Sequence, residues 1–211
     1  MHARVRLTLI AAAGVVAAAL LAVVLVAGVG GKGNDDRLAG VSSRRSSFEG
    51  AVMPKGVRAP DFALKDQNGR PISMAALRGK PTVVTFLYTT CEDTCPLEAQ
   101  QIRGALDELG NDDGVNAVAV AVDPPRDTPK QARRFLAEQR IYDRMRFVLG
   151  TRRQLTPVWR GFFIQEQRDD AEHQARVVLL DRRGYQRVGY PGSELTPERI
   201  AHDLRLLLRE D

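Results

Sequence analysis

Apolar runs and helical periodicities alternate along most of this 211-residue chain. The runs PTVVTFLY (81–88) and VNAVAVAV (115–122) are apolar at nearly every position, as expected of strands buried on both faces. The shorter runs RFVL (146–149) and RVVLL (176–180) predict two further strands. Between the runs lie segments with helical spacing, at 96–109, 129–140, 153–161 and 197–209. This alternation predicts an α/β fold in which helices pack on both faces of a sheet.

A hairpin is predicted just before the first buried strand. The segment DFALKDQNGRPIS (61–73) has two short runs on either side of Asn68-Gly69. This dipeptide is typical of the tight turn that joins two antiparallel strands.

The N-terminal part of the chain predicts a membrane anchor and a tether. From Leu7 to Gly31 there is no charged residue, and a run of this length can span a bilayer, which needs about 20 residues. The alternative is a secretory signal that is cleaved near Ala27 to Gly31. The segment that follows is rich in Gly, Ser and charge, which is typical of a flexible linker. The predicted regions are a short basic N-terminus (1–6), a transmembrane signal-anchor (7–31), a linker (32–56) and a globular domain (57–211).

This organisation predicts a single-pass protein of the cell membrane with its globular domain on the extracytoplasmic side. A disulfide is chemically allowed there. The chain has 31 Lys and Arg against 26 Asp and Glu, and the surplus is spread along the sequence. Because no dense basic block with interleaved aromatic residues occurs, we do not expect a nucleic-acid partner. The domain is long enough to form its own core, and we expect it to be monomeric.

Three helix starts share one pattern, in which a threonine at the N-cap precedes a proline in the first turn. The pairs are Thr128-Pro129, Thr156-Pro157 and Thr196-Pro197. Gln131 follows Thr128 at the spacing of a capping box. Cys95-Pro96 repeats the pattern with sulfur in place of oxygen, and Glu98 follows at the third helical position. We therefore expect Cys95 to cap a helix.

Both cysteines of the chain lie in TTCEDTCPLE (89–98), with Cys91 at the end of the buried strand. The positive end of a helix should lower the pKa of both thiols. A structural disulfide would close a loop too short to stabilise the fold much, so a redox couple and a metal site are the stronger hypotheses. A metal site needs a third ligand, for which imidazole is suited. His2 precedes the apolar run and His202 is expected on a solvated helix face, which leaves His173.

From about Phe48 onward the chain resembles the Sco/SenC family of membrane-anchored copper proteins, which have a thioredoxin-like fold with a central mixed sheet. The resemblance is carried, in the same order, by DFALKDQNGRPISMAALRGKPTVVTFLYTTCEDTCP, VDPPRDTP and HQARVVLLDRRG. It implies that Cys91, Cys95 and His173 bind copper, as Cu(I) and also as Cu(II). The implied task is to assist assembly of the dinuclear copper centre of cytochrome c oxidase subunit II. The expected partner is that subunit or another exported copper protein.

The chain departs from the family pattern C-P-x-x-C-P because Glu92 follows Cys91. We interpret Glu92 and Asp93 as turn-forming residues, and outer metal ligands are the alternative. Asp123 and Asp127, in the VDPPRDTP motif, are interpreted as structural.

An enzyme is the main alternative to a metallochaperone. In a thiol-disulfide oxidoreductase Cys91 would be the nucleophile and Cys95 the resolving cysteine. Reductases of similar fold usually carry a cis-proline where this chain has Ala175, which favours the metallochaperone. A membrane-tethered adaptor that uses the fold without its cysteines is a third hypothesis.

Overall fold

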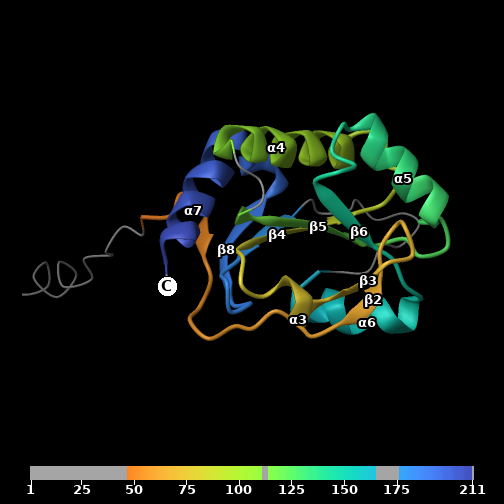
Figure 1. Cartoon of the computed structure of the whole chain (residues 1–211), viewed down its shortest axis with the longest axis horizontal. Coiled ribbons are helices and arrows are strands. Elements are labelled where there is room, and N and C mark those ends of the chain that lie inside the picture. Colours follow the sequence, from red (N-terminus) through yellow and green to blue (C-terminus); the bar gives the residue numbers. More distant parts are fainter. Residues whose placement is uncertain (1–46, 111–113, 165–175, 211) are drawn as a thin grey trace, which may run out of the picture. The chain divides into compact units, whose positions relative to one another are not determined.

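A six-stranded mixed sheet runs through the domain in the computed structural model, which describes residues 47–110, 114–164 and 176–210 (Figure 1). The strand order is β1–β8–β7–β4–β5–β6. β4, β5 and β6 are parallel, whereas β7, β8 and β1 run antiparallel to their neighbours. The strands are β1 (Ala51–Val52), β4 (Thr82–Leu87), β5 (Asn116–Ala121), β6 (Met145–Val148), β7 (Arg176–Leu180) and β8 (Gln186–Pro191).

The central strands are buried, as the apolar runs in their sequences predict. All six residues of β4 are buried, as are five of the six residues of β5. β4 has β5 on one side and β7 on the other, and helices cover both sheet faces (Figure 1). The four predicted strands lie within one residue of the observed bounds. β8 was not predicted, because its sequence QRVGYP mixes polar residues and glycine with few apolar residues.

Helices lie on both faces of the sheet (Figure 1). Helices α4, α5 and α7 lie on one face, and α4 packs against α7. Helices α3 and α6 lie on the other face with the predicted hairpin, which is formed by β2 and β3. The bounds are β2 (Ala63–Lys65), β3 (Pro71–Ser73), α3 (Met74–Leu77), α4 (Thr94–Leu109), α5 (Pro129–Glu138), α6 (Arg152–Gly161), the 3₁₀ helix η2 (Gly192–Glu194) and α7 (Pro197–Arg209).

Two of the three threonine caps are confirmed. The Thr128 hydroxyl accepts a hydrogen bond from the amide of Gln131 at the start of α5. The Thr196 hydroxyl accepts one from the amide of Arg199 at the start of α7.

The predicted cap at Thr156 is wrong. Helix α6 begins earlier, where Thr151 and Gln154 form a complete capping box, and Pro157 lies inside the helix. The Thr156 hydroxyl donates to the carbonyl of Arg152 one turn back, at 2.8 Å. A threonine bonded this way is a residue of the helix interior.

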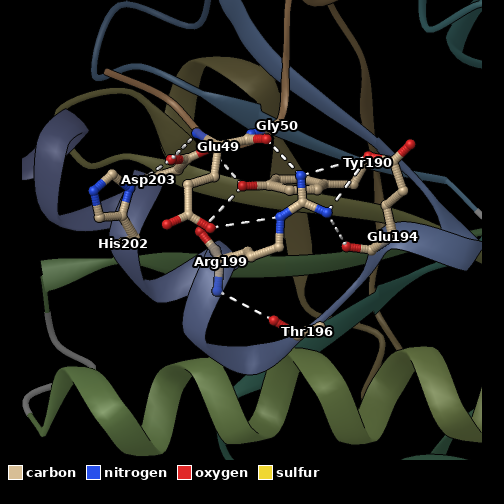
Figure 2. Close-up of polar contacts among 8 residues, drawn as sticks. All are labelled: Glu49, Gly50, Tyr190, Glu194, Thr196, Arg199, His202 and Asp203. Carbon is tan, nitrogen blue, oxygen red and sulfur yellow. Dashed lines mark hydrogen bonds and ion pairs between the residues drawn. The ribbon is translucent and has the colours of Figure 1, made fainter. Parts of the chain in front are cut away.

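The chain joins the sheet earlier than the predicted boundary at residue 57. Ala51 and Val52, which fall within the predicted linker, pair with β8 as strand β1. Just before them, the amides of Glu49 and Gly50 donate to the two carboxyl oxygens of Asp203 on α7, at 2.8 and 3.0 Å (Figure 2). These bonds fasten Glu49 and Gly50 to the last helix.

Asp203 is completely buried and is the centre of this attachment. The Tyr190 hydroxyl also donates to it, and the ring of His202 lies 2.9 Å from its second oxygen (Figure 2). His202 is exposed as predicted, since 42% of its side chain is accessible, but its ring also contacts the Asp203 carboxylate. Gly50 has no room for a side chain, since a Cβ there would lie 2.4 Å from Val188.

None of the helices in the described ranges is long and apolar enough to cross a membrane. The predicted anchor at residues 7–31 lies outside those ranges.

Replacing Asp203 with alanine should destabilise the domain. The substitution leaves the part-buried amides of Glu49 and Gly50 without their acceptor. It also removes one acceptor of the Tyr190 hydroxyl, which keeps its bond to the Arg199 carbonyl. The free energy of unfolding should therefore fall by about 3 kcal/mol. Urea unfolding of the purified chain measures this. Glu194→Ala is the control, because that carboxylate is exposed and its ion pair with Arg199 should contribute less than about 1 kcal/mol. Equal losses in the two variants would contradict the attachment described here.

Candidate metal centre

Strand β4 carries the chain directly to the two cysteines. After Leu87 the chain turns, and the amide of Cys91 donates to the carbonyl of Tyr88 at 3.3 Å. Cys91 is 9% exposed, whereas Cys95, one turn further on in α4, is 1% exposed. The structure thus brings the two cysteines together at the start of a helix, with one sulfur near the surface and the other in the core.

The predicted role of Cys95 as the helix cap is wrong, because α4 begins one residue before it. The N-cap is Asp93, whose side chain makes no capping hydrogen bond. The Cys91 sulfur instead accepts the amide of Cys95 at 3.2 Å, and it lies 3.5 Å from the hydroxyl of Thr94. The sulfur that caps α4 therefore belongs to Cys91.

The two thiols differ in acidity, so the expectation of two acidic thiols holds for one of them. The pKa of Cys91 is lowered because Cys95 donates a hydrogen bond to its sulfur, and the Thr94 hydroxyl and the Cys95 amide add to this. The pKa of Cys95 is raised because it gives that bond and because it is buried. The hydrogen bond between the two sulfurs thus favours the negative charge on Cys91 and the proton on Cys95.

Tyr88 is a neighbour that sequence reasoning missed. Burial raises the pKa of Tyr88 to about 12, and a hydrogen bond to the Cys91 sulfur contributes to the rise. A neutral phenol that donates to a thiolate stabilises the charge on sulfur. The available signal was a tyrosine three residues before the first cysteine.

Glu98 is buried behind the cysteines and was also missed. It was predicted at the third position of the helix, but it is the fifth residue of α4 and only 2% exposed. The Thr85 hydroxyl on β4 donates to one carboxyl oxygen, and the other has no partner among the described residues. Burial raises the pKa of Glu98 to about 8. The signal was its spacing of three from Cys95 and four from Ile102, which places all three on one helix face.

The acidic residues of the VDPPRDTP motif lie in the loop that follows β5. Asp127 is 5% exposed, and its carboxylate accepts the amides of Thr89 and Asp123. Burial raises the pKa of Asp127 to about 6, although these amides oppose the rise. The interpretation of Asp123 and Asp127 as structural leaves out this link to the loop that carries Cys91.

The third predicted ligand cannot be placed, because His173 lies outside the described residues, as does Ala175. Glu92 and Asp93 are exposed in the turn before α4. Over residues 47–110, 114–164 and 176–210, no three side chains of His, Cys, Asp or Glu are grouped as a metal site. The two sulfurs fit a soft metal ion, since thiolates are the ligands that Cu(I) prefers.

A mixed-sheet α/β domain with this dithiol belongs to the thioredoxin-like class. The sequence profile of the SCO1/SenC family matches residues 53–209, which is more than half of the chain. The chain therefore belongs to the SCO1/SenC family.

Relatives by sequence include the mitochondrial SCO1 homolog 1 of Arabidopsis thaliana, which is 27% identical over 59% of this chain and 38% of its own length. A putative copper-binding protein of Stutzerimonas stutzeri is 31% identical over 42% of this chain and 45% of its own length. The chain thus spans less than half of either relative. Among solved structures, Bradyrhizobium japonicum ScoI with copper bound is 30% identical, with a TM-score of 0.61 over 71% of this chain and 99% of that one.

Alkylation should distinguish the two thiols. At pH 6 we expect iodoacetamide to modify Cys91 at least about tenfold faster than Cys95, because Cys91 is the thiolate and the more exposed sulfur. Mass spectrometry of peptides from the reduced chain gives the two rates. In urea the cysteines should react alike. Faster modification of Cys95 in the folded chain would contradict the assignment.

Glu98 should make stability depend on pH. Its pKa is about 8 in the folded state, whereas the ordinary value of 4.5 applies to the unfolded chain. The unfolded chain therefore loses this proton first as pH rises, and stability falls between these values by up to about 1.4 kcal/mol per pH unit.

Glu98→Gln removes this effect while keeping the shape. Between pH 5 and pH 8 the wild type should lose at least about 2 kcal/mol more than the variant in urea unfolding. Parallel profiles for the two proteins would show that Glu98 is ionised in the folded state.

Proposed function

We propose that this chain is a membrane-tethered copper metallochaperone whose domain works on the extracytoplasmic side. Cys91 and Cys95 hold Cu(I), His173 completes the site, and the same ligands accept Cu(II). The chain assists assembly of the dinuclear copper centre of cytochrome c oxidase subunit II. Family membership supports this proposal, as does the copper-bound state of the ScoI structure.

The observation that carries the proposal is the Cys91 sulfur at the start of α4. It accepts the amide of Cys95, it is stabilised as a thiolate, and it lies near the surface. A soft sulfur that carries negative charge can bind Cu(I), which prefers such ligands. A site with few ligands, one of them 9% exposed, also lets an incoming ligand attach before the first ones leave, which transfer of the ion requires.

Chain connectivity supports His173 as the third ligand. β7 is antiparallel to β4, and Val177 pairs with Thr85. The start of β7 at Arg176 therefore lies at the sheet end where β4 leads to Cys91. His173 is three residues before Arg176, and three residues span at most about 11 Å. This reach supports His173 as a copper ligand, and we propose that its imidazole lies beside the two sulfurs.

A thiol-disulfide oxidoreductase is the second candidate function. A more acidic, slightly exposed thiol beside a fully buried one is the arrangement of a nucleophile, here Cys91, and a resolving cysteine, here Cys95. The same dithiol serves both functions, and only the metallochaperone needs His173.

Metal binding by the full-length chain, purified in detergent, tests the proposal. After reduction and loading with Cu(I), we expect one copper per chain, and Cys91→Ser and Cys95→Ser should each abolish tight binding. His173→Ala should weaken Cu(I) binding at least about tenfold, as the loss of a ligand interaction above about 1.4 kcal/mol. The matched control is His202→Ala, which should bind copper normally.

Exchange with a small disulfide separates the candidate functions. His173→Ala should retain the wild-type exchange rate, because the dithiol is intact. Unchanged copper affinity in that variant would contradict the three-ligand site. Absence of copper uptake by the wild type, with fast exchange, would favour the oxidoreductase.

A further inference from the structure

Asp127 joins the loop that carries the cysteines to the neighbouring loop. It lies after β5, and one of its carboxyl oxygens accepts the amide of Thr89, which follows β4, at 2.7 Å. The other oxygen accepts the amide of Asp123 at 2.9 Å. One buried carboxylate thus bonds both to the backbone that follows β4 and to the backbone that follows β5.

The bond to Thr89 continues the ladder between the two strands. The amide of Val122 donates to the carbonyl of Leu87 at 3.1 Å, where the paired part of β4 and β5 ends. The chain then diverges into two different loops. The bond from Thr89 to Asp127 connects those loops two residues beyond Leu87. It therefore restrains the segment that leads to Cys91, where backbone pairing no longer does.

The loop that presents Asp127 is itself well fixed. The amides of Arg126 and Asp127 both donate to the carbonyl of Asp123, at 3.0 and 2.8 Å. Thr128, the next residue, caps α5. Arg126 also pairs with the Asp123 carboxylate. Because these bonds fix the backbone around Asp127, its bond to Thr89 fixes the cysteine loop relative to the sheet.

The position of the Cys91 sulfur depends on this restraint. Thr89 lies inside the turn closed by the bond from the Cys91 amide to Tyr88. That turn places the sulfur 3.2 Å from the amide of Cys95. We propose that Asp127 is a positioning residue for the dithiol, since its bond to Thr89 holds the Cys91 sulfur over the first turn of α4. The inference rests on the proposed function only in taking this dithiol as the working site.

Asp127→Asn tests the proposal, because an amide group offers one acceptor oxygen where the carboxylate offers two. The matched control is Asp66→Asn. Asp66 is similarly buried, and it also uses both carboxyl oxygens. One accepts the amides of Asn68 and Arg70 in the β2–β3 turn, and the other accepts from Arg146, so the asparagine loses a bond there too. Both variants should lose stability, but only Asp127→Asn should alter the dithiol.

The first measurement is the equilibrium constant of the metal-free dithiol with glutathione, in the full-length chain in detergent. A misplaced Cys91 sulfur loses the amide donor that it has in the reduced form, so the reduced form is destabilised relative to the disulfide. We expect a tenfold shift toward the disulfide in Asp127→Asn, or about 30 mV. The Asp66→Asn value should stay within twofold of the wild type.

Competition with a chromophoric Cu(I) chelator gives a second measurement, in which Asp127→Asn should bind about tenfold more weakly. Should that variant fail to fold, Thr89→Pro removes the donor of the same bond and should give the same two shifts. Wild-type values in Asp127→Asn, or equal shifts in Asp66→Asn, would overturn the positioning role. A wild type that binds no copper would refute the proposed function, while the glutathione measurement would still test Asp127.

Discussion

The hydrogen bond from the Cys95 amide to the Cys91 sulfur is the interaction on which the chemistry of this domain depends. It satisfies an amide at the start of α4 that the side chain of Asp93 leaves free. The same bond stabilises negative charge on sulfur, together with the thiol of Cys95. The same hydrogen bond therefore both caps the helix and favours the thiolate form of Cys91. Any change that displaces Cys91 should affect both the first turn of the helix and the affinity of the site for a soft cation.

The sheet supplies the rigid support for this bond. β4 is buried along its whole length, and it leads the chain into the Cys91 turn with little freedom. Glu98 and Thr85 tie the first turns of α4 to β4, and Asp127 ties the loop after β4 to the loop after β5. Both carboxylates are buried, and burial raises the pKa of each. Burial thus disfavours the ionised form of both acids that support the cysteine loop and the first turns of α4.

Sequence alone predicted the parts of the fold that follow from burial. Runs such as PTVVTFLY and VNAVAVAV admit few structures other than buried strands, and the Asn68-Gly69 turn fixed the hairpin. Strand β8 was missed because its burial comes from long-range pairing with β7, which its own composition does not reveal. The cap at Thr156 was misassigned because the competing Thr151–Gln154 box lies only five residues earlier.

At the site, sequence identified the two cysteines but not their division of roles. The N-cap pattern favoured Cys95, whereas the turn after β4 brings the sulfur of Cys91 back over the helix. Asp127 and Glu98 could not be assigned because their partners, Thr89 and Thr85, are distant in sequence and are brought close by the sheet. The VDPPRDTP motif was noted for its resemblance to the family. Its link to the cysteine loop arises only in the folded chain, where β4 and β5 lie side by side.

The most direct test of the central claim is X-ray absorption spectroscopy of the full-length chain loaded with one equivalent of Cu(I). The account predicts a copper ion with two sulfur neighbours and one imidazole nitrogen, because Cys91, Cys95 and His173 are the proposed ligands. A spectrum with a single sulfur neighbour, or with three or more sulfurs shared between chains, would contradict it.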